Sequence, residues 1–279
     1  MTQLSRPLLR WHGGKWMLAP WIISHFPKHR VYVEPFGGAG SVLMRKDRSY
    51  AEVWNDLDGE VVNLFQVLRS TDSSRLVEVL ELTPFSREEF KMAYREADAD
   101  PVERARQLVI RSFMGFGSNG HSRVTGFRAN SNRSGTTPAH DWANYPEALT
   151  AIIERLRGVV VENRDAKRVM ATHDSADTLH YVDPPYVFET RSDPSKDYAH
   201  EMTDDDHAEL LDFLQGLAGM VVLSGYPSAL YDDALQGWRR IERAALADGA
   251  ARRIEVLWIN PPCAERLCAE AMPLLAGVE

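Results

Sequence analysis

Near the start of the chain a short apolar strand and a helix are joined by a glycine-rich loop, and this unit constrains the fold more than any other feature. Residues 30–34 predict a buried strand, the loop covers 36–41, and a helix begins at 42–44. The same order is repeated, because 51–54 predicts a strand and 61–68 carries apolar residues at helical intervals. Strands that alternate with helices form parallel sheets. We therefore expect an α/β fold with a doubly wound, mostly parallel sheet.

The glycine-rich loop has the composition of a ligand-binding turn. Gly37, Gly38 and Gly40 allow the backbone to turn tightly and to approach a ligand, and the next helix offers unpaired N–H groups. A tight connection without a ligand is the alternative. The second strand ends in Asn55 and Asp56, and a carboxylate there can accept hydrogen bonds from the ribose of a nucleoside. A solvated strand end is the alternative for that pair.

A second candidate site is the tetrapeptide Asp183-Pro184-Pro185-Tyr186, which directly follows a predicted strand at 180–182. Two prolines fix the backbone, so a carboxylate, a carbonyl and an aromatic ring converge beyond the strand. The exocyclic amine of a nucleobase is planar and poorly nucleophilic, and two acceptors against its hydrogens favour a pyramidal amine with a free lone pair. Tyr186 can stack on the base. In the alternative, Asp183 caps a backbone group and Tyr186 packs in the core.

The segment 70–164 departs from the alternation of strands and helices and predicts an insert. Helices are expected at 86–97 and 101–114, and 115–138 is a long loop without apolar periodicity. The net charge of the chain is −8, yet six arginines and no acidic residue lie between 104 and 140. The arginines are Arg104, Arg106, Arg111, Arg123, Arg128 and Arg133. This local positive charge indicates an anion-binding face on an acidic body, with a solvated loop as the alternative.

The remaining chain continues the α/β pattern. Strands are predicted at 159–162, 220–223 and 253–259, and a helix begins at Thr203. Ser224, which follows the strand at 220–223, is expected at the same sheet edge as the tetrapeptide.

Length and composition place the chain inside the cell. Its 279 residues allow one large domain or a core with an insert. No apolar run approaches the roughly 18 residues that cross a membrane, and the first residues lack the apolar region of an export signal. The two cysteines, Cys263 and Cys268, are too few for a disulfide framework. We expect a cytoplasmic protein with no membrane partner and no metal, since His200, Glu201 and His207 lack zinc-motif spacing.

Four motifs occur in the order and spacing of one enzyme family. They are Trp11-His12-Gly13-Gly14-Lys15, Tyr32-Val33-Glu34-Pro35-Phe36-Gly37-Gly38-Ala39-Gly40-Ser41-Val42, Asn55-Asp56 and Asp183-Pro184-Pro185-Tyr186. Along nearly its whole length the chain resembles the Dam-like DNA adenine methyltransferases, the alpha group of amino-methyltransferases. The resemblance implies a sheet of the S-adenosylmethionine-dependent methyltransferase (Rossmann-like) type. It also implies a catalytic methyltransferase domain at 1–69 and 165–279, with a mostly helical target-recognition insert at 70–164.

The resemblance also implies roles for individual residues. Those implied to bind S-adenosylmethionine are Trp11, Lys15, Glu34, Pro35, Phe36, Gly37, Gly38, Gly40, Asp56 and Asp183. The implied catalytic residues are Asp183, Pro184 and Tyr186, and the implied DNA-binding residues are Arg111, Asn119, Arg123, Arg128 and Arg133. A helix cap for Lys15, a core position for Trp11 and a loop contact for Glu34 are the alternatives.

The reaction implied by the resemblance is site-specific methylation of adenine N6 in double-stranded DNA. The base is flipped out of the duplex, and its amine takes the methyl group by direct displacement. A cognate restriction system is an open further partner. Methylation of cytosine, of adenine in RNA or of a protein glutamine is the alternative among enzymes. A DNA-binding or nucleotide-sensing module with an inactive pocket is the other alternative, but it has no chemical need for Lys15, Asp183 and Tyr186 together.

Overall fold

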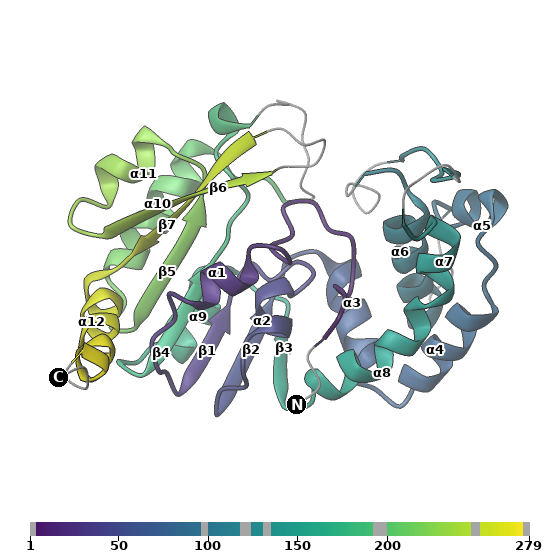
Figure 1. The fold of residues 1–279 in the computed structure, drawn as a ribbon, viewed down its shortest axis with the longest axis horizontal. Coiled ribbons are helices and arrows are strands. Elements are labelled where there is room, and N and C mark those ends of the chain that lie inside the picture. Colours follow the sequence, from purple (N-terminus) through teal and green to yellow (C-terminus); the bar gives the residue numbers. More distant parts are fainter. Residues whose placement is uncertain are drawn as a thin grey trace.

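The centre of the molecule is a seven-stranded sheet (Figure 1). The computed structural model describes residues 4–95, 100–117, 124–130, 135–191, 200–246 and 252–275. The strands are β1 (Val31–Glu34), β2 (Ala51–Asn55), β3 (Val159–Glu162), β4 (Thr178–Val182), β5 (Met220–Gly225), β6 (Arg239–Leu246) and β7 (Arg252–Ile259). Their order is β3-β2-β1-β4-β5-β7-β6, parallel from β3 to β5, with β7 antiparallel to both of its neighbours. The expected doubly wound, mostly parallel sheet is confirmed.

Among the described strands, β6 is the one that the sequence pattern did not predict. It pairs with β7 along its whole length, with Ile241 opposite Leu257. Arginines and a glutamate interrupt its apolar residues, so it has neither an apolar run nor a regular alternation. The strand lies at the edge of the sheet, where a polar sequence is tolerated because one side faces no other strand.

Side chains alternate between the two faces of the sheet, and each face has its own apolar core. Tyr32 belongs to one core and Val33 to the other. The helices on the face of Tyr32 are α1 (Ala19–Ile23), α2 (Ser41–Arg45), α3 (Gly59–Leu68) and α12 (Pro261–Leu275). Those on the opposite face are α9 (Ala166–His173), α10 (Asp204–Gln215) and α11 (Ala229–Ala234). Both faces are thus covered, which leaves the carboxyl ends of the parallel strands for ligands (Figure 1).

Capping residues predicted the helix starts better than the helix ends. Thr203 and Asp206 form a capping box at α10, as expected. Ser86 accepts a hydrogen bond from the backbone of Glu89 at the start of α5 (Arg87–Met92). The expected end of this helix at 97 is wrong, because the backbone of Tyr94 turns back to bond the carbonyl of Lys91.

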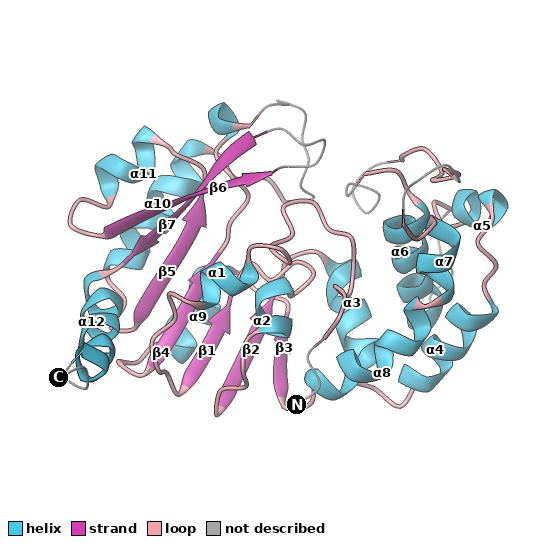
Figure 2. Cartoon of the chain, in the orientation of Figure 1, coloured by secondary structure: helices cyan, strands magenta, loops and turns pink. Residues whose placement is uncertain are grey.

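A group of helices lies beside the sheet and forms the insert (Figures 1 and 2). These helices are α4 (Ser73–Leu82), α5, α6 (Pro101–Met114), α7 (Pro138–Ala143) and α8 (Tyr145–Arg155). Helix α6 packs against α3, and the apolar side chains of the insert belong to the same core as Tyr32. The expected end of the insert at 164 needs correction. Strand β3 lies inside the 70–164 segment but pairs with β2, Val161 opposite Trp54, so it belongs to the sheet.

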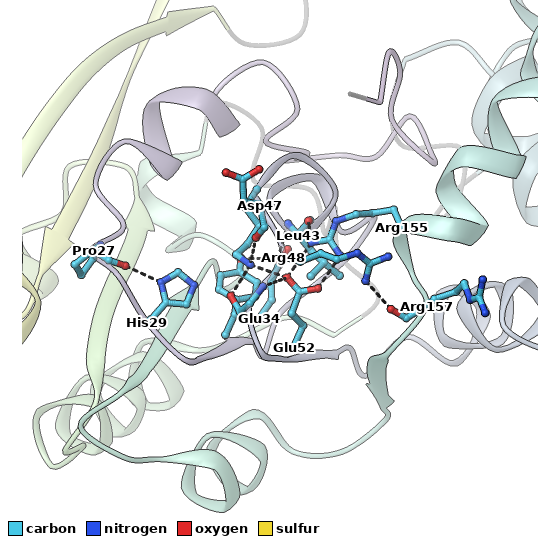
Figure 3. A network of polar contacts seen from close by, with 12 residues as sticks. Pro27, His29, Glu34, Leu43, Asp47, Arg48, Glu52, Arg155 and Arg157 are labelled. Atoms are coloured by element: carbon cyan, nitrogen blue, oxygen red, sulfur yellow. Dashed lines mark hydrogen bonds and ion pairs between the residues drawn. The ribbon is translucent and has the colours of Figure 1, made fainter. Parts of the chain in front are cut away.

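Two arginines that point in opposite directions fasten the end of α8 to the segment that joins α2 and β2 (Figure 3). Arg155 donates to both carboxylate oxygens of Glu52, at 2.7 and 2.9 Å, and to the carbonyl of Leu43. Arg48 donates in return to two backbone carbonyls at the end of α8. Lys46 also donates to Glu52, at 2.6 Å. Because these side chains are buried, removal of Glu52 would leave the charges of Lys46 and Arg155 without their acidic partner.

Candidate active site

A cavity of about 300 Å³ lies at the carboxyl edge of the parallel strands. Its wall includes residues 34–39 after β1, 56–58 after β2, 165–167 after β3 and 183–185 after β4, together with 11–15 from the N-terminal segment. The cavity therefore spans the point where the strand order reverses, between β1 and β4. Ligands of α/β sheets bind at this point, and cavities of this size hold small molecules.

The cavity brings most of the predicted site residues together. Those in its wall are Trp11, Lys15, Glu34, Pro35, Phe36, Gly37, Gly38, Asp56, Asp183 and Pro184. Gly40 is not part of the wall; it precedes α2 in the left-handed conformation, with φ of +65°. Tyr186 also lies outside the wall and is buried beside Lys15. Residues far apart in the sequence thus meet at one edge of the sheet.

The glycine loop is held between two indole rings. The Gly37 N–H donates to the carbonyl of Asn55 at 2.8 Å. A Cβ atom on Gly37 would lie 2.0 Å from Trp54 Nε1, and one on Gly38 would lie 2.6 Å from Trp11 Nε1. Gly38 also has a positive φ of +46°, which other residues rarely adopt. The loop therefore follows a path beside the cavity that larger residues would obstruct.

Glu34 is an uncharged acid in the cavity wall. Its side chain is buried, and Oε2 accepts hydrogen bonds from the hydroxyl of Tyr32 at 2.7 Å and from the N–H of Leu43 at 2.9 Å. Burial, together with the charge of Asp183, raises the pKa of Glu34 to about 8, although both hydrogen bonds favour the ionised form. Glu34 therefore keeps its proton at neutral pH, and it ties the end of β1 to α2.

Asp56 joins the end of β2 to the glycine loop. Its Oδ2 accepts from the N–H of Gly38 at 2.7 Å and its Oδ1 from the N–H of Asp58 at 2.8 Å. Burial raises the pKa of Asp56 to about 6, although both backbone hydrogen bonds favour the ionised form. Above that pH the carboxylate is charged and lies in the wall of the cavity.

Two side chains orient the carboxylate of Asp183. Lys15 Nζ lies 3.0 Å from Oδ2, and the hydroxyl of Ser224 donates to Oδ1 at 2.6 Å. Lys15 also donates to the carbonyl of Gly13 at 2.7 Å, so the ammonium is itself fixed. Ser224, in β5, lies at the same edge of the sheet as the tetrapeptide, as predicted. The carboxylate is thus presented to the cavity in one defined orientation.

Tyr186 is positioned by residues from three other segments. Its hydroxyl donates to Glu255 Oε2 at 2.9 Å, and its ring meets Tyr226 edge-on with centroids 4.5 Å apart. Lys15 Nζ lies 4.7 Å from the centroid of the same ring. Glu255, in β7, was missed from the sequence because a single glutamate in a strand forms no motif. Its proximity follows from β7, which runs antiparallel to β5.

The structure adds further cavity residues that no motif predicted. Asp165 and Lys167 follow β3. Met202 lies just before α10, and Leu210 lies within that helix. Asp165 caps α9 three residues after the end of β3, as Asp58 caps α3 three residues after the end of β2. Because parallel strands bring their carboxyl ends to one edge, this position could have been inferred once β3 was predicted.

The arginines of the insert differ in their surroundings. Arg111 donates to the carbonyl of Ala93 at 2.7 Å, and Arg128 donates to the carbonyl of Phe113 at 3.0 Å. Arg128 lies in the segment that an isolated bridge between Gly115 and Phe127 joins to the end of α6. The other predicted DNA-binding residues, Asn119, Arg123 and Arg133, lie outside the described residues.

Two of the six arginines counted between 104 and 140 pair with acidic residues that lie outside that interval. Arg104 pairs with Glu60, at 2.6 Å. Arg106 pairs with Glu89 and Glu103, at 2.9 and 2.7 Å. These acids precede the counted interval, so its local composition did not reveal them. Arg104 and Arg106 thus stabilise the packing of α6.

Neither a metal centre nor a membrane span is found in the part of the chain that the structure describes. No three His, Cys, Asp or Glu side chains there are grouped as metal ligands. No helix there has the length and apolar character to cross a bilayer. His200 borders the cavity, and His207 is buried with its Nδ1 3.0 Å from the hydroxyl of Tyr231.

The strand order and the cavity define a class of protein. A seven-stranded sheet with an antiparallel β7 and a glycine loop after β1 is the fold of the S-adenosylmethionine-dependent methyltransferases. The tetrapeptide after β4 contributes Asp183 and Pro184 to the same cavity wall as that loop.

Comparisons with known proteins identify the family within this class. The D12 class N6 adenine-specific DNA methyltransferases match residues 11–246. The DNA adenine methylase of Escherichia coli (strain K12) is 25% identical over 263 residues, which cover 89% of this chain and 92% of that protein. The DNA adenine methylase of Salmonella typhi is 28% identical over 189 residues, 66% of each chain. The Type II methyltransferase M.MjaIII of Methanocaldococcus jannaschii is 25% identical over 239 residues, 76% of this chain and 80% of that protein.

The chain belongs to the D12 class N6 adenine-specific DNA methyltransferase family. The protein is therefore a transferase that methylates adenine in DNA, as the motifs predicted. The family also decides between adenine and the cytosine, RNA and protein alternatives.

Proposed function

We propose that the cavity binds S-adenosylmethionine as the methyl donor. In the wall, the carboxylate of Asp56 can accept hydrogen bonds from ribose hydroxyls, and the rings of Trp11 and Phe36 can contact a purine. The glycine loop lets a ligand lie close to the backbone. The volume of about 300 Å³ lies at the lower end of the range for small-molecule sites. When bound, S-adenosylmethionine supplies a methyl group carried on a positively charged sulfur.

We further propose that Asp183 and Pro184 hold the target amine. The observation that carries this proposal is the fixed carboxylate of Asp183, held by Lys15 and Ser224 at the cavity wall. The carboxylate and the carbonyl of Pro184 would accept the two amine hydrogens, which frees the lone pair of N6. Direct displacement would form the bond from N6 to the methyl carbon as the methyl–sulfur bond breaks, a neutral thioether would leave, and N6 would lose one of its two protons. No covalent bond to the enzyme is needed. Positioning of the two reactants supplies most of the rate.

We propose that the insert binds and reads duplex DNA at a specific site. Arg128 and Arg111 supply positive charge there, and arginines neutralise phosphates or read guanine edges. An adenine inside a duplex is out of reach of Asp183, so the base must turn out of the helix. Residues 70–158 form the target-recognition part in this proposal, and the sheet with its remaining helices forms the catalytic part.

The cellular setting is also part of the proposal. A protein that acts on DNA in a cell without a nucleus works in the cytoplasm. A cognate restriction system remains an open partner, since one similar protein is named a Type II methyltransferase. Restriction and modification, phage protection and regulation would each use the same chemistry.

The test is methylation of DNA by wild-type protein and by two variants at opposite ends of β4. Unmethylated duplex DNA is incubated with S-adenosylmethionine, digested to nucleosides and analysed by mass spectrometry. Wild type should yield N6-methyldeoxyadenosine, and Asp183→Ala should yield none while still binding S-adenosylmethionine in a calorimeter. Asp177→Ala, at the exposed start of the same strand, should behave as wild type. Normal turnover by Asp183→Ala would refute the proposed mechanism.

A further inference from the structure

The carboxylate of Glu255 lies beside the proposed methyl-transfer site without belonging to any of its motifs. Glu255 is 7% exposed and follows directly on Ile254, which is 44% exposed. It belongs to β7, where it lies opposite Arg243 of β6. Because β7 runs antiparallel to β5, the early part of β7 reaches the carboxyl edge of the parallel strands. The direction of β7 thus places a buried acid at the same edge of the sheet as the site.

The ring of Tyr186 is constrained on its face and edge, and Glu255 constrains its hydroxyl. Lys15 lies over the ring, and Tyr226 meets it at an interplanar angle of 75°. The hydrogen bond to Glu255 Oε2, at 2.9 Å, adds a directional restraint at the hydroxyl end of the ring. The ring that directly follows the two prolines of the tetrapeptide is therefore held by an acid 69 positions away in the sequence.

The charges around Glu255 link it to the catalytic carboxylate. Lys15 favours the ionised form of Glu255, as Arg253 also does, and Asp183 opposes it. Burial raises the pKa of Glu255, and the hydrogen bond from Tyr186 lowers it. Lys15 thus pairs with the carboxylate of Asp183, and its charge also favours the ionised form of Glu255. A carboxylate in such a position orients the groups around it without reaching the substrate.

We propose that Glu255 is a positioning residue for methyl transfer, which holds Tyr186 through its hydroxyl so that the ring is aligned beside the target adenine. This inference rests on the proposed function, in which the adenine amine is held by Asp183. Glu255 is not among the residues that line the cavity. Its effect is expected on the rate of the chemical step and not on donor binding, because a small misplacement of reactants slows catalysis far more than it weakens binding.

The experiment compares four variants in single-turnover methylation of duplex DNA, with donor affinity measured by calorimetry. Glu255→Ala and Tyr186→Phe each remove the same hydrogen bond, and each should lower the rate about tenfold or more while donor affinity stays within about twofold. Glu255→Gln retains an oxygen that can accept from Tyr186 and should restore the rate to within about threefold of wild type. The double variant Tyr186→Phe/Glu255→Ala should be no slower than its slower parent, because both changes break one interaction.

The matched control is Glu242→Ala, on the neighbouring strand β6, where Glu242 is half-exposed and pairs with Arg240. It should leave the rate unchanged. A rate for Glu255→Ala equal to that of the control, or a double variant whose loss is the product of the two single losses, would overturn the role of Glu255. If Glu255→Ala fails to fold, the difference between Tyr186→Phe and Glu255→Gln decides, because both keep the buried volume. Failure of wild type to methylate adenine would instead refute the proposed function.

Discussion

Gly37→Ala tests whether the space beside the glycine loop matters more than its flexibility. An added Cβ would lie 2.0 Å from Nε1 and 2.4 Å from Cδ1 of Trp54. Trp54 is fully buried and stacks on Phe65, with centroids 3.8 Å apart and an interplanar angle of 8°. The indole therefore cannot retreat without disturbing the core. Overpacking of this kind costs about 1–3 kcal/mol of unfolding free energy. Displacement of the loop should also weaken S-adenosylmethionine binding.

The assay is urea unfolding followed by tryptophan fluorescence, together with calorimetric titration of S-adenosylmethionine. Gly59→Ala is the matched control, because a Cβ there meets nothing within 4 Å and alanine suits the first turn of α3. The control should be as stable as wild type or slightly more so. In a Trp54→Phe background, which provides more room, Gly37→Ala should cost less. The packing argument is refuted if Gly37→Ala matches Gly59→Ala in both stability and donor affinity.

Four further predictions concern ionisable groups. Because the pKa of Glu34 is raised to about 8 in the folded protein, wild type should lose stability as the pH rises from about 4.5 through 8, whereas Glu34→Gln should not; urea unfolding across that range measures the difference. Because burial lowers the pKa of His207 to about 4, wild type should lose stability as the pH falls from about 6.5 through 4, and a flat melting temperature would contradict the burial of a neutral ring. Asp56→Ala should weaken S-adenosylmethionine binding about tenfold, as measured by calorimetry. An unchanged affinity would remove Asp56 from the donor site. Arg128→Ala should lower DNA affinity and flatten its salt dependence by about 0.9 in the log-log slope, with exposed Arg266→Ala, on α12, as the control.

The parts of the site that lie on one continuous motif were predictable, and the parts that the topology assembles were not. The glycine loop and the tetrapeptide at 183–186 each carry their geometry in local sequence, since glycines and prolines restrict the backbone directly. Glu255 reaches the site only because β7 is antiparallel, and that direction depends on β6, whose polar sequence hid it. A parallel sheet could be inferred from alternating elements, whereas an edge hairpin could not.

The charge of the insert also could not be fully predicted from the sequence. A count from 104 to 140 found six arginines and no acid, but Arg104 and Arg106 pair with Glu60 on α3, with Glu89 on α5 and with Glu103, which lies just before the counted interval. Neighbours in space replace neighbours in sequence once helices pack. The helices themselves were easier to predict: α6 begins and ends at the expected residues, because Pro101 at its first turn and the glycine after Met114 mark both ends.

The paired arginines at the end of α8 bear on how such an enzyme could be re-engineered. Arg155 reaches from the insert into the sheet, and Arg48 reaches from the sheet into the insert, so each part supplies half of the joint. A helical segment grafted from a relative in place of α4 to α8 would have to bring an arginine at the place of Arg155. Without it, Glu52 and Lys46 would remain charged in a buried site that is shaped for three charged side chains. A segment exchanged between relatives would therefore have to extend beyond the end of α8. It would also have to keep the contacts that Arg155 and Arg48 make between the helices and the sheet.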